Sequence, residues 1–111
     1  MVTKQENPFI GRWRISEMEA WDQDFVDLIV PGFIKFDADN LGEFQFGAVH
    51  GFLDCQLVTY DKRPRLEFSW DGEDDSDPAS GRGWATIKNG VISGHIYIHR
   101  GDDSWFKAKR K

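Results

Sequence analysis

Apolar and polar residues alternate in steps of two along most of the chain. The clearest runs lie at 9–16, 43–50, 65–71 and 91–99. Successive side chains of a β-strand point to opposite faces, so each run predicts a strand with one buried face. The same pattern extends to other segments, and the full prediction comprises strands at 9–16, 31–37, 43–50, 52–60, 65–71, 82–88, 91–99 and 104–110.

Turn signals separate these runs. Asn89-Gly90 is the strongest of them, because both residue types tolerate the positive φ that a two-residue hairpin requires. Weaker signals lie at 40–42, 50–51, 61–64 and 101–103. Regular spacing of short strands and turns predicts an antiparallel meander that closes into a barrel, with a split sandwich as the alternative.

One segment departs from the alternation. Ser16 and Glu19 have the spacing of a capping box, in which a helix begins at the serine. Apolar residues then recur at helical spacing, at Met18, Trp21, Phe25, Leu28 and Ile29. Pro31 and Gly32 would end such a helix. The pattern predicts a helix of about three turns between the first two strands.

The first strand carries a short motif. Gly11-Arg12-Trp13 resembles the G-x-W that opens lipocalin and other calycin barrels, in which the tryptophan plugs one end. A helix between the first two strands also resembles the fatty-acid-binding-protein arrangement, where helices form a lid. The expected fold is therefore an all-β, eight-stranded, antiparallel up-and-down, calycin-like barrel, formed by one domain at 1–111.

A second resemblance covers most of the chain, from Trp13 to Ala108. The segments 68–77, 80–85 and 101–104 contain F-S-W-x-G-x-D, S-G-R-G-W-A and G-D-D-S. They resemble segments of a family of small uncharacterised bacterial proteins. That resemblance implies one compact domain and brings no known activity with it.

Composition narrows the possible partners. The 111 residues include 14 Lys and Arg against 19 Asp and Glu, a net charge of −5. Such a chain is a poor general binder of nucleic acid or of anionic membranes. No apolar run approaches the roughly 18 residues of a membrane span, and residues 1–8 lack the apolar core of a signal peptide. With a single cysteine, Cys55, no intrachain disulfide is possible, so a cytoplasmic location is expected.

Charge separates between the ends of the predicted barrel. Connections alternate between ends, so the helix, the 50–51 turn, the 72–81 loop and the 101–103 turn share one end. That end collects acid: Glu17, Glu19, Asp22, Asp24, Asp27, Asp71, Glu73, Asp74, Asp75, Asp77, Asp102 and Asp103. The opposite end collects base: Lys4, Lys62, Arg63, Lys88, Lys107, Lys109, Arg110 and Lys111.

Tryptophans are expected at the acidic end as well. The candidate ligand-binding residues are Trp21, Trp70, Trp84 and Trp105, with Asp71, Asp74, His50 and His99. Carboxylates beside indole rings suit a cation, through Coulomb attraction and a cation–π contact of roughly 0.5–2 kcal/mol. The first hypothesis is a non-enzymatic barrel that binds a small apolar or cationic ligand beneath the helix, without a cofactor.

Each of these signals also has a purely structural interpretation. The aromatic residues could simply fill a small barrel, and the acidic loop 72–81 could be solvated rather than hold Ca²⁺. Ser80-Gly81-Arg82-Gly83 could form an anion-binding nest, or Arg82 could pair with nearby acids. Cys55 reads as a buried small hydrophobe rather than a nucleophile.

Two further functional classes remain open. One is an inhibitor-like or immunity-like interaction module, which uses the acidic end to bind a basic protein partner. The other is an enzyme with a carboxylate within hydrogen-bond reach of His50 or His99. A ligand barrel needs a cavity, whereas an interaction module needs an exposed patch. The sequence does not indicate the oligomeric state.

Overall fold

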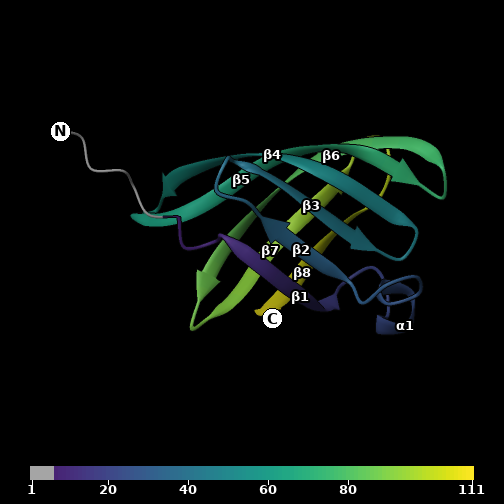
Figure 1. The fold of residues 1–111 in the computed structure, drawn as a ribbon, viewed down its shortest axis with the longest axis horizontal. Helices are drawn as coiled ribbons and strands as arrows, with labels where there is room; N and C mark the ends of the chain where they lie inside the picture. Colours follow the sequence, from purple (N-terminus) through teal and green to yellow (C-terminus); the bar gives the residue numbers. More distant parts are fainter. Residues whose placement is uncertain (1–6) are drawn as a thin grey trace.

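In a computed structural model, which describes residues 7–111, eight antiparallel strands follow one another around a closed barrel (Figure 1). The strands are β1 (Gly11–Met18), β2 (Phe33–Phe36), β3 (Leu41–Phe46), β4 (Val49–Tyr60), β5 (Arg63–Asp74), β6 (Asp77–Lys88), β7 (Val91–Ile98) and β8 (Asp103–Arg110). A single short helix, α1 (Gln23–Val26), lies between β1 and β2. The predicted fold class is confirmed. Among residues 7–111, no helix is long and apolar enough to cross a membrane.

Hairpin turns set the register of the longest strands. Asn89 and Gly90 join β6 to β7 with φ of 54° and 77°, the positive values that the Asn-Gly signal predicts. Asp61 and Lys62 join β4 to β5 in the same conformation. The barrel closes where β1 pairs with β8, from Trp13 opposite Arg110 to Met18 opposite Phe106.

Side chains fill the inside of the barrel. The largest of them are Trp13, Phe36, Phe44, Phe46, Phe68, Trp70 and Phe106, each at most 5% exposed. Several rings fit because a glycine faces them. A Cβ at Gly51 would lie 2.6 Å from the Phe44 ring and 2.7 Å from the indole of Trp70. The aromatic residues therefore act as core, and the cavity that a ligand barrel needs is occupied by side chains.

The basic end is closed by a plug. Trp13 is buried there, and its indole Nε1 donates to the Phe9 carbonyl over 2.8 Å. The Arg110 guanidinium lies 3.9 Å from the centre of the Trp13 ring and donates to the carbonyl of Ile10. Gly11 has φ of +128°, and a Cβ there would meet Arg110 Nη1. Trp13 thus helps to close this end of the core. Lys4, assigned to this end from the sequence, lies outside the described residues.

The predicted three-turn helix is wrong. Residues 16–18 belong to β1, and the helix is a single turn that begins at Asp22, whose carboxylate accepts from Phe25 N. Ser16 does not cap it; the Ser16 hydroxyl donates to the Lys107 carbonyl. The pairing of β1 with β8 shifts register between Ile15 and Glu17, which is a β-bulge. The bulge places buried Ile15 and Met18 three residues apart, and this spacing imitates a helix.

Two connections also differ from the prediction. The turn expected at 50–51 lies at Gly47 and Ala48, and His50 belongs to β4. The expected loop 72–81 is a β-hairpin, whose only unpaired residues are Asp75 and Ser76 at its tip. Its strands continue the barrel wall into a projection at the end where α1 lies (Figure 1).

Candidate functional site

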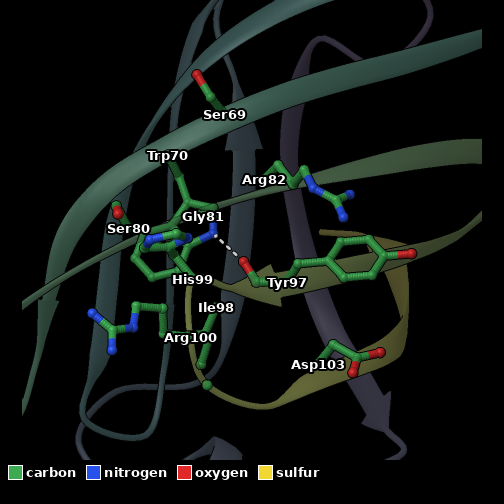
Figure 2. A pocket seen from close by; sticks show the side chains of 11 residues that line it. Ser69, Trp70, Ser80, Gly81, Arg82, Tyr97, Ile98, His99, Arg100 and Asp103 are labelled. Atoms are coloured by element: carbon green, nitrogen blue, oxygen red, sulfur yellow. Dashed lines mark hydrogen bonds between the residues drawn. The ribbon is translucent and has the colours of Figure 1, made fainter.

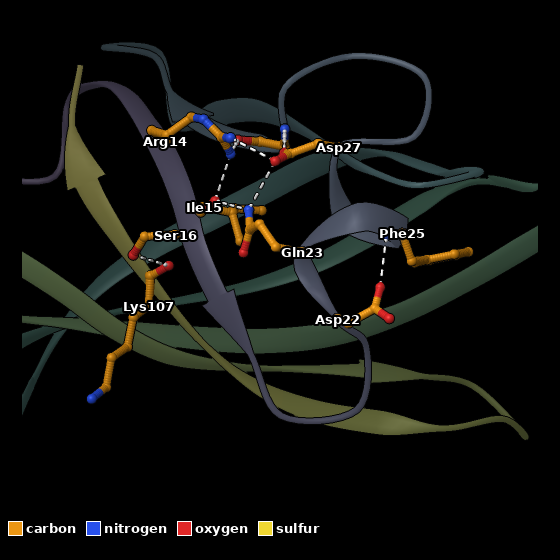
Figure 3. A network of polar contacts seen from close by, with 9 residues as sticks. Arg14, Ile15, Ser16, Asp22, Gln23, Phe25, Asp27 and Lys107 are labelled. Atoms are coloured by element: carbon orange, nitrogen blue, oxygen red, sulfur yellow. Dashed lines mark hydrogen bonds and ion pairs between the residues drawn. The ribbon is translucent and has the colours of Figure 1, made fainter.

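A polar network fastens α1 to the wall of the barrel (Figure 3). Arg14 on β1 forms an ion pair with Asp27, with 2.7 Å between Nη2 and Oδ2. Asp27 also accepts from the amide of Gly32, and Gln23 Nε2 donates both to Asp27 and to the Ile15 carbonyl. The hydrogen bond from Arg14 lowers the pKa of Asp27 below its ordinary value of 3.8. The loop that contains α1 is therefore held at both of its ends.

Aromatic packing places α1 over the end of the barrel. The Trp21 ring lies 5.0 Å from the ring of Phe46, and Phe25 stacks on Trp21 at 6.0 Å. Val26 is fully buried. A Cβ at Gly47 would lie 2.3 Å from the Phe25 ring. The helix therefore covers this end of the core and leaves no open mouth.

Three connections meet beside α1. The amide of Gly47 donates to the Val26 carbonyl over 2.9 Å, which joins the β3–β4 turn to the helix. The amide of Asp75 donates to the Ala48 carbonyl over 3.0 Å, which joins the β5–β6 hairpin to the same turn. These bonds hold the three connections next to one another. We call the exposed acidic and aliphatic residues of α1, its loop and the hairpin the acidic rim: Asp22, Asp24, Leu28, Ile29, Glu73, Asp74, Asp75 and Asp77.

The acidic rim carries charge without compensation. None of its six carboxylates has a basic group within 4.0 Å among residues 7–111. Asp74 and Asp77 are direct cross-strand partners, an arrangement of like charges that weakens a hairpin. Leu28 and Ile29 are 65% and 60% exposed. The surface therefore combines repelling carboxylates with two exposed aliphatic side chains.

The four candidate tryptophans do not share one site. Trp21 packs under α1, as described above, and Trp70 is an interior residue, 3% exposed. The expectation that Trp84 and Trp105 line the same mouth is wrong. Each lies between two inward-facing residues of its strand, so both indoles face outward from the wall. The sheet itself separates them from Trp70.

On the outside of the wall, Trp84 belongs to a ladder of cations and rings. Arg65 lies 4.4 Å from the centre of the Trp84 ring. The His95 ring stacks with Trp84 at 6.5 Å and is tilted against Tyr97 at 4.5 Å. Trp105 faces His95 across β7 and β8. The cations and ring faces here already have partners within the chain.

One pocket of about 620 Å³ lies close to two predicted site residues, Trp70 and His99. It is lined by residues of β5, β6, β7, the β7–β8 connection and the start of β8 (Figure 2). The indole Nε1 of Trp70 donates to the Tyr97 carbonyl over 3.1 Å. Arg82 and Arg100 also line the pocket. Its lining is therefore richer in cations than in carboxylates.

The remaining predicted site residues lie elsewhere. His50 faces outward from β4, and its Nε2 lies 2.5 Å from Glu43 Oε2. Asp71 is exposed on β5, opposite Ser80, and Asp74 belongs to the acidic rim. His50 thus has the carboxylate partner that the enzyme hypothesis requires, but the pair is separate from the pocket beside Trp70.

The structure also bears on the predictions for Ser80 to Gly83 and for Cys55. Ser80 to Gly83 form an extended part of β6, so the predicted anion nest is absent there. Burial raises the pKa of the Cys55 thiol to about 12, which leaves essentially no thiolate at neutral pH. Among residues 7–111, no group of three or more His, Cys, Asp or Glu side chains is arranged to hold a metal ion.

Some features of the site were missed from the sequence. Arg82 was expected to pair with nearby acids, yet its guanidinium lies 4.2 Å from the Tyr97 ring. The signal was available, because both residues fall on the outward face of their strands. Leu28 and Ile29 were assigned to a buried helix face and are exposed instead.

Comparison with known proteins yields no relative. No family model, no curated protein and no solved structure matches the chain.

Proposed function

We propose that this barrel is a non-enzymatic interaction module that binds a basic partner protein through its acidic rim. The observation that carries the proposal is the set of six unpaired carboxylates on adjoining connections, together with two exposed aliphatic side chains. Leu28 and Ile29 would form the apolar part of the contact, and the surrounding carboxylates would supply attraction and orientation.

The filled interior favours this class over a ligand barrel. Core aromatic residues occupy the barrel, and α1 covers the end where a lipophilic ligand would enter. A filled interior favours a binding site on the surface. An acidic surface patch attracts a basic partner and raises its association rate.

The electrostatics of the rim support selection for binding rather than for stability. Asp74 and Asp77 face each other directly, which costs roughly 0.2–1 kcal/mol relative to a neutral pair. No cation among residues 7–111 offsets this repulsion. A basic partner would supply the missing counter-charge.

A synthetic amphipathic peptide of lysine and leucine serves as the probe, with binding measured by calorimetry. We expect Asp77→Lys to weaken binding about tenfold, because it replaces an attraction with a repulsion. Leu28→Ser with Ile29→Ser should weaken binding by a similar factor. The affinity of the unaltered protein should fall as sodium chloride is added.

Asp54→Lys is the matched control. Asp54 is an exposed aspartate on β4, outside the rim, and its replacement changes the net charge by the same amount. The control should bind within about twofold of the unaltered protein, because a local patch rather than net charge determines affinity. If both variants lose affinity equally, the peptide senses net charge alone and the rim is not the binding surface.

A further inference from the structure

We propose that the pocket beside Trp70 is a second binding site, which takes a small, multiply charged anion such as a polycarboxylate or a phosphate monoester. The pocket has a volume of about 620 Å³, which is within the range of small-molecule sites. Its lining lies where β5 and β6 extend past the end of β7, next to the buried Trp70.

The charges around this pocket favour an anion. Arg82, His99 and Arg100 line it, and neither arginine has a carboxylate within 4.0 Å among residues 7–111. Asp103 is the one carboxylate in the lining, and its Oδ2 lies 2.5 Å from His95 Nε2. The local excess of cations contrasts with the net charge of −5 of the whole chain.

The arrangement of Arg82 leaves its donors available. Its guanidinium lies 4.2 Å from the centre of the Tyr97 ring, and Figure 2 shows the two side chains extending together. Stacking occupies the face of a guanidinium but leaves the N–H groups at its edge free for a carboxylate or phosphate. The contact with Tyr97 also restricts the side chain before any ligand arrives, which lowers the entropy cost of binding.

Polar groups on both sides of the pocket add to the site. Arg100 lies across the pocket from Arg82 in Figure 2, on the connection between β7 and β8. Ser69 and Ser80 also line the pocket, and neither hydroxyl has a hydrogen-bond partner among residues 7–111. The Trp70 and His99 side chains lie between the two guanidinium groups in Figure 2, and two separate cations suit an anion with more than one charged group.

The backbone of the pocket is fixed independently of any ligand. Trp70 Nε1 donates to the Tyr97 carbonyl over 3.1 Å, and the His99 amide donates to the Ser80 carbonyl over 2.7 Å. A Cβ at Gly81 would meet both the Tyr97 carbonyl and Trp70 Nε1, so glycine is required where β6 crosses the pocket. The site is therefore preformed on a paired sheet rather than on a loose loop.

The test titrates citrate, phenyl phosphate and inorganic phosphate into the isotopically labelled protein and follows amide chemical shifts. We expect saturable shifts centred on Ser80, Arg82, Tyr97 and His99 with citrate and with phenyl phosphate. Arg82→Gln should weaken binding about tenfold or more, since a charge-assisted bond contributes roughly 1.5–3 kcal/mol. Arg100→Gln should show a loss in the same direction.

Arg12→Gln is the matched control, because Arg12 is also an exposed strand arginine stacked on a ring, at 3.8 Å from Phe33. It should leave the anion affinity within about twofold. Equal losses in Arg12→Gln and Arg82→Gln would overturn the proposal, as would shifts spread over all basic residues or no shifts at 10 mM anion.

Two other outcomes bear on the proposal. Tighter binding of citrate than of inorganic phosphate supports an extended anion as the ligand. Equal affinity overturns the claim that the pocket binds several charged groups of one anion at the same time. Sedimentation velocity tests whether the acidic hairpin of a second copy occupies the pocket: a dimer that Arg82→Gln dissociates would replace the small anion as the ligand. The titrations with citrate, phenyl phosphate and inorganic phosphate do not depend on the acidic rim, so the two proposals succeed or fail separately.

Discussion

The two ends of the barrel satisfy their polar groups in different ways. At the basic end, Arg110 stacks on Trp13 and donates to backbone carbonyls, so its charge is used inside the chain. At the acidic end, the carboxylates of the rim have no basic partner among residues 7–111. Arg110 therefore helps to close a core, whereas the rim carboxylates leave charge available to another molecule. The basic-end side chains Lys62, Arg63, Lys88 and Lys109 also have no ion-pair partner within 4.0 Å among residues 7–111.

The comparison predicts that stability depends most on the basic end. Trp13→Ala should lower the free energy of unfolding by about 3–5 kcal/mol, because it removes a buried indole and leaves Arg110 without its ring. Urea denaturation measures the change. Trp13→Phe keeps a ring but loses the bond to the Phe9 carbonyl, and should cost about 1–2 kcal/mol. Trp84→Ala, which removes an outward-facing tryptophan, is the control. If Trp13→Ala is at least as stable as Trp84→Ala, Trp13 does not stabilise the fold as a plug.

An intermediate effect is expected where α1 is fastened to the wall. Asp27→Asn removes the ion pair with Arg14 and should cost about 1–2 kcal/mol at pH 7. Because folding lowers the pKa of this carboxyl, its contribution is present above the unfolded value of 3.8 and is lost as the pH falls through the folded value. In denaturation experiments at pH 7 and at successively lower pH, the variant's deficit in the free energy of unfolding should shrink as the pH falls below 3.8; a deficit that does not change with pH would contradict the assignment.

The smallest effect on stability, of opposite sign, is expected at the tip of the hairpin. Asp77→Lys turns a repulsion with Asp74 into an attraction and should raise the free energy of unfolding by about 0.2–1 kcal/mol. Thermal denaturation at low and high salt measures the gain, which salt should reduce. A variant that is more stable but binds the basic peptide less well would show that Asp77 contributes to binding and not to stability. A loss of stability would show that the carboxylate has a structural role.

Much of the fold was readable because the core residues alternate. The even spacing of Phe68 and Trp70, and that of Ile92 and Ile96, directly predicts the strands in which they lie. Prediction failed where alternation was interrupted or hidden. The bulge near Ser16 produced a false helical spacing, and Gly47 reverses the chain with φ of 56° inside an apparently regular run. In the 72–81 segment the inward positions include small residues such as Gly72 instead of large apolar ones. The alternation is therefore hidden, and the sequence predicts a loop where the structure has a paired hairpin.

The candidate site was harder to predict than the fold. Sequence patterning assigned acids to one end correctly, because connection parity alone determines which hairpins meet. It could not place Trp84 on the outer wall without the true start of β6, which lies at Asp77 rather than at 82. Nor could it show that Arg82 stacks on Tyr97, since that contact depends on the register between β6 and β7.

The seam between β1 and β8 has a consequence for how the chain folds. Trp13 and Arg110 are partners across this seam, although nearly the whole sequence lies between them. Every other strand pair joins neighbours along the chain, six of them through short turns and β1 and β2 through the segment that contains α1, whereas this pair needs the closure of a very long loop. Until it forms, the edges of β1 and β8 remain unpaired and prone to aggregation. Closure of the seam is therefore the step that we expect to limit the folding rate.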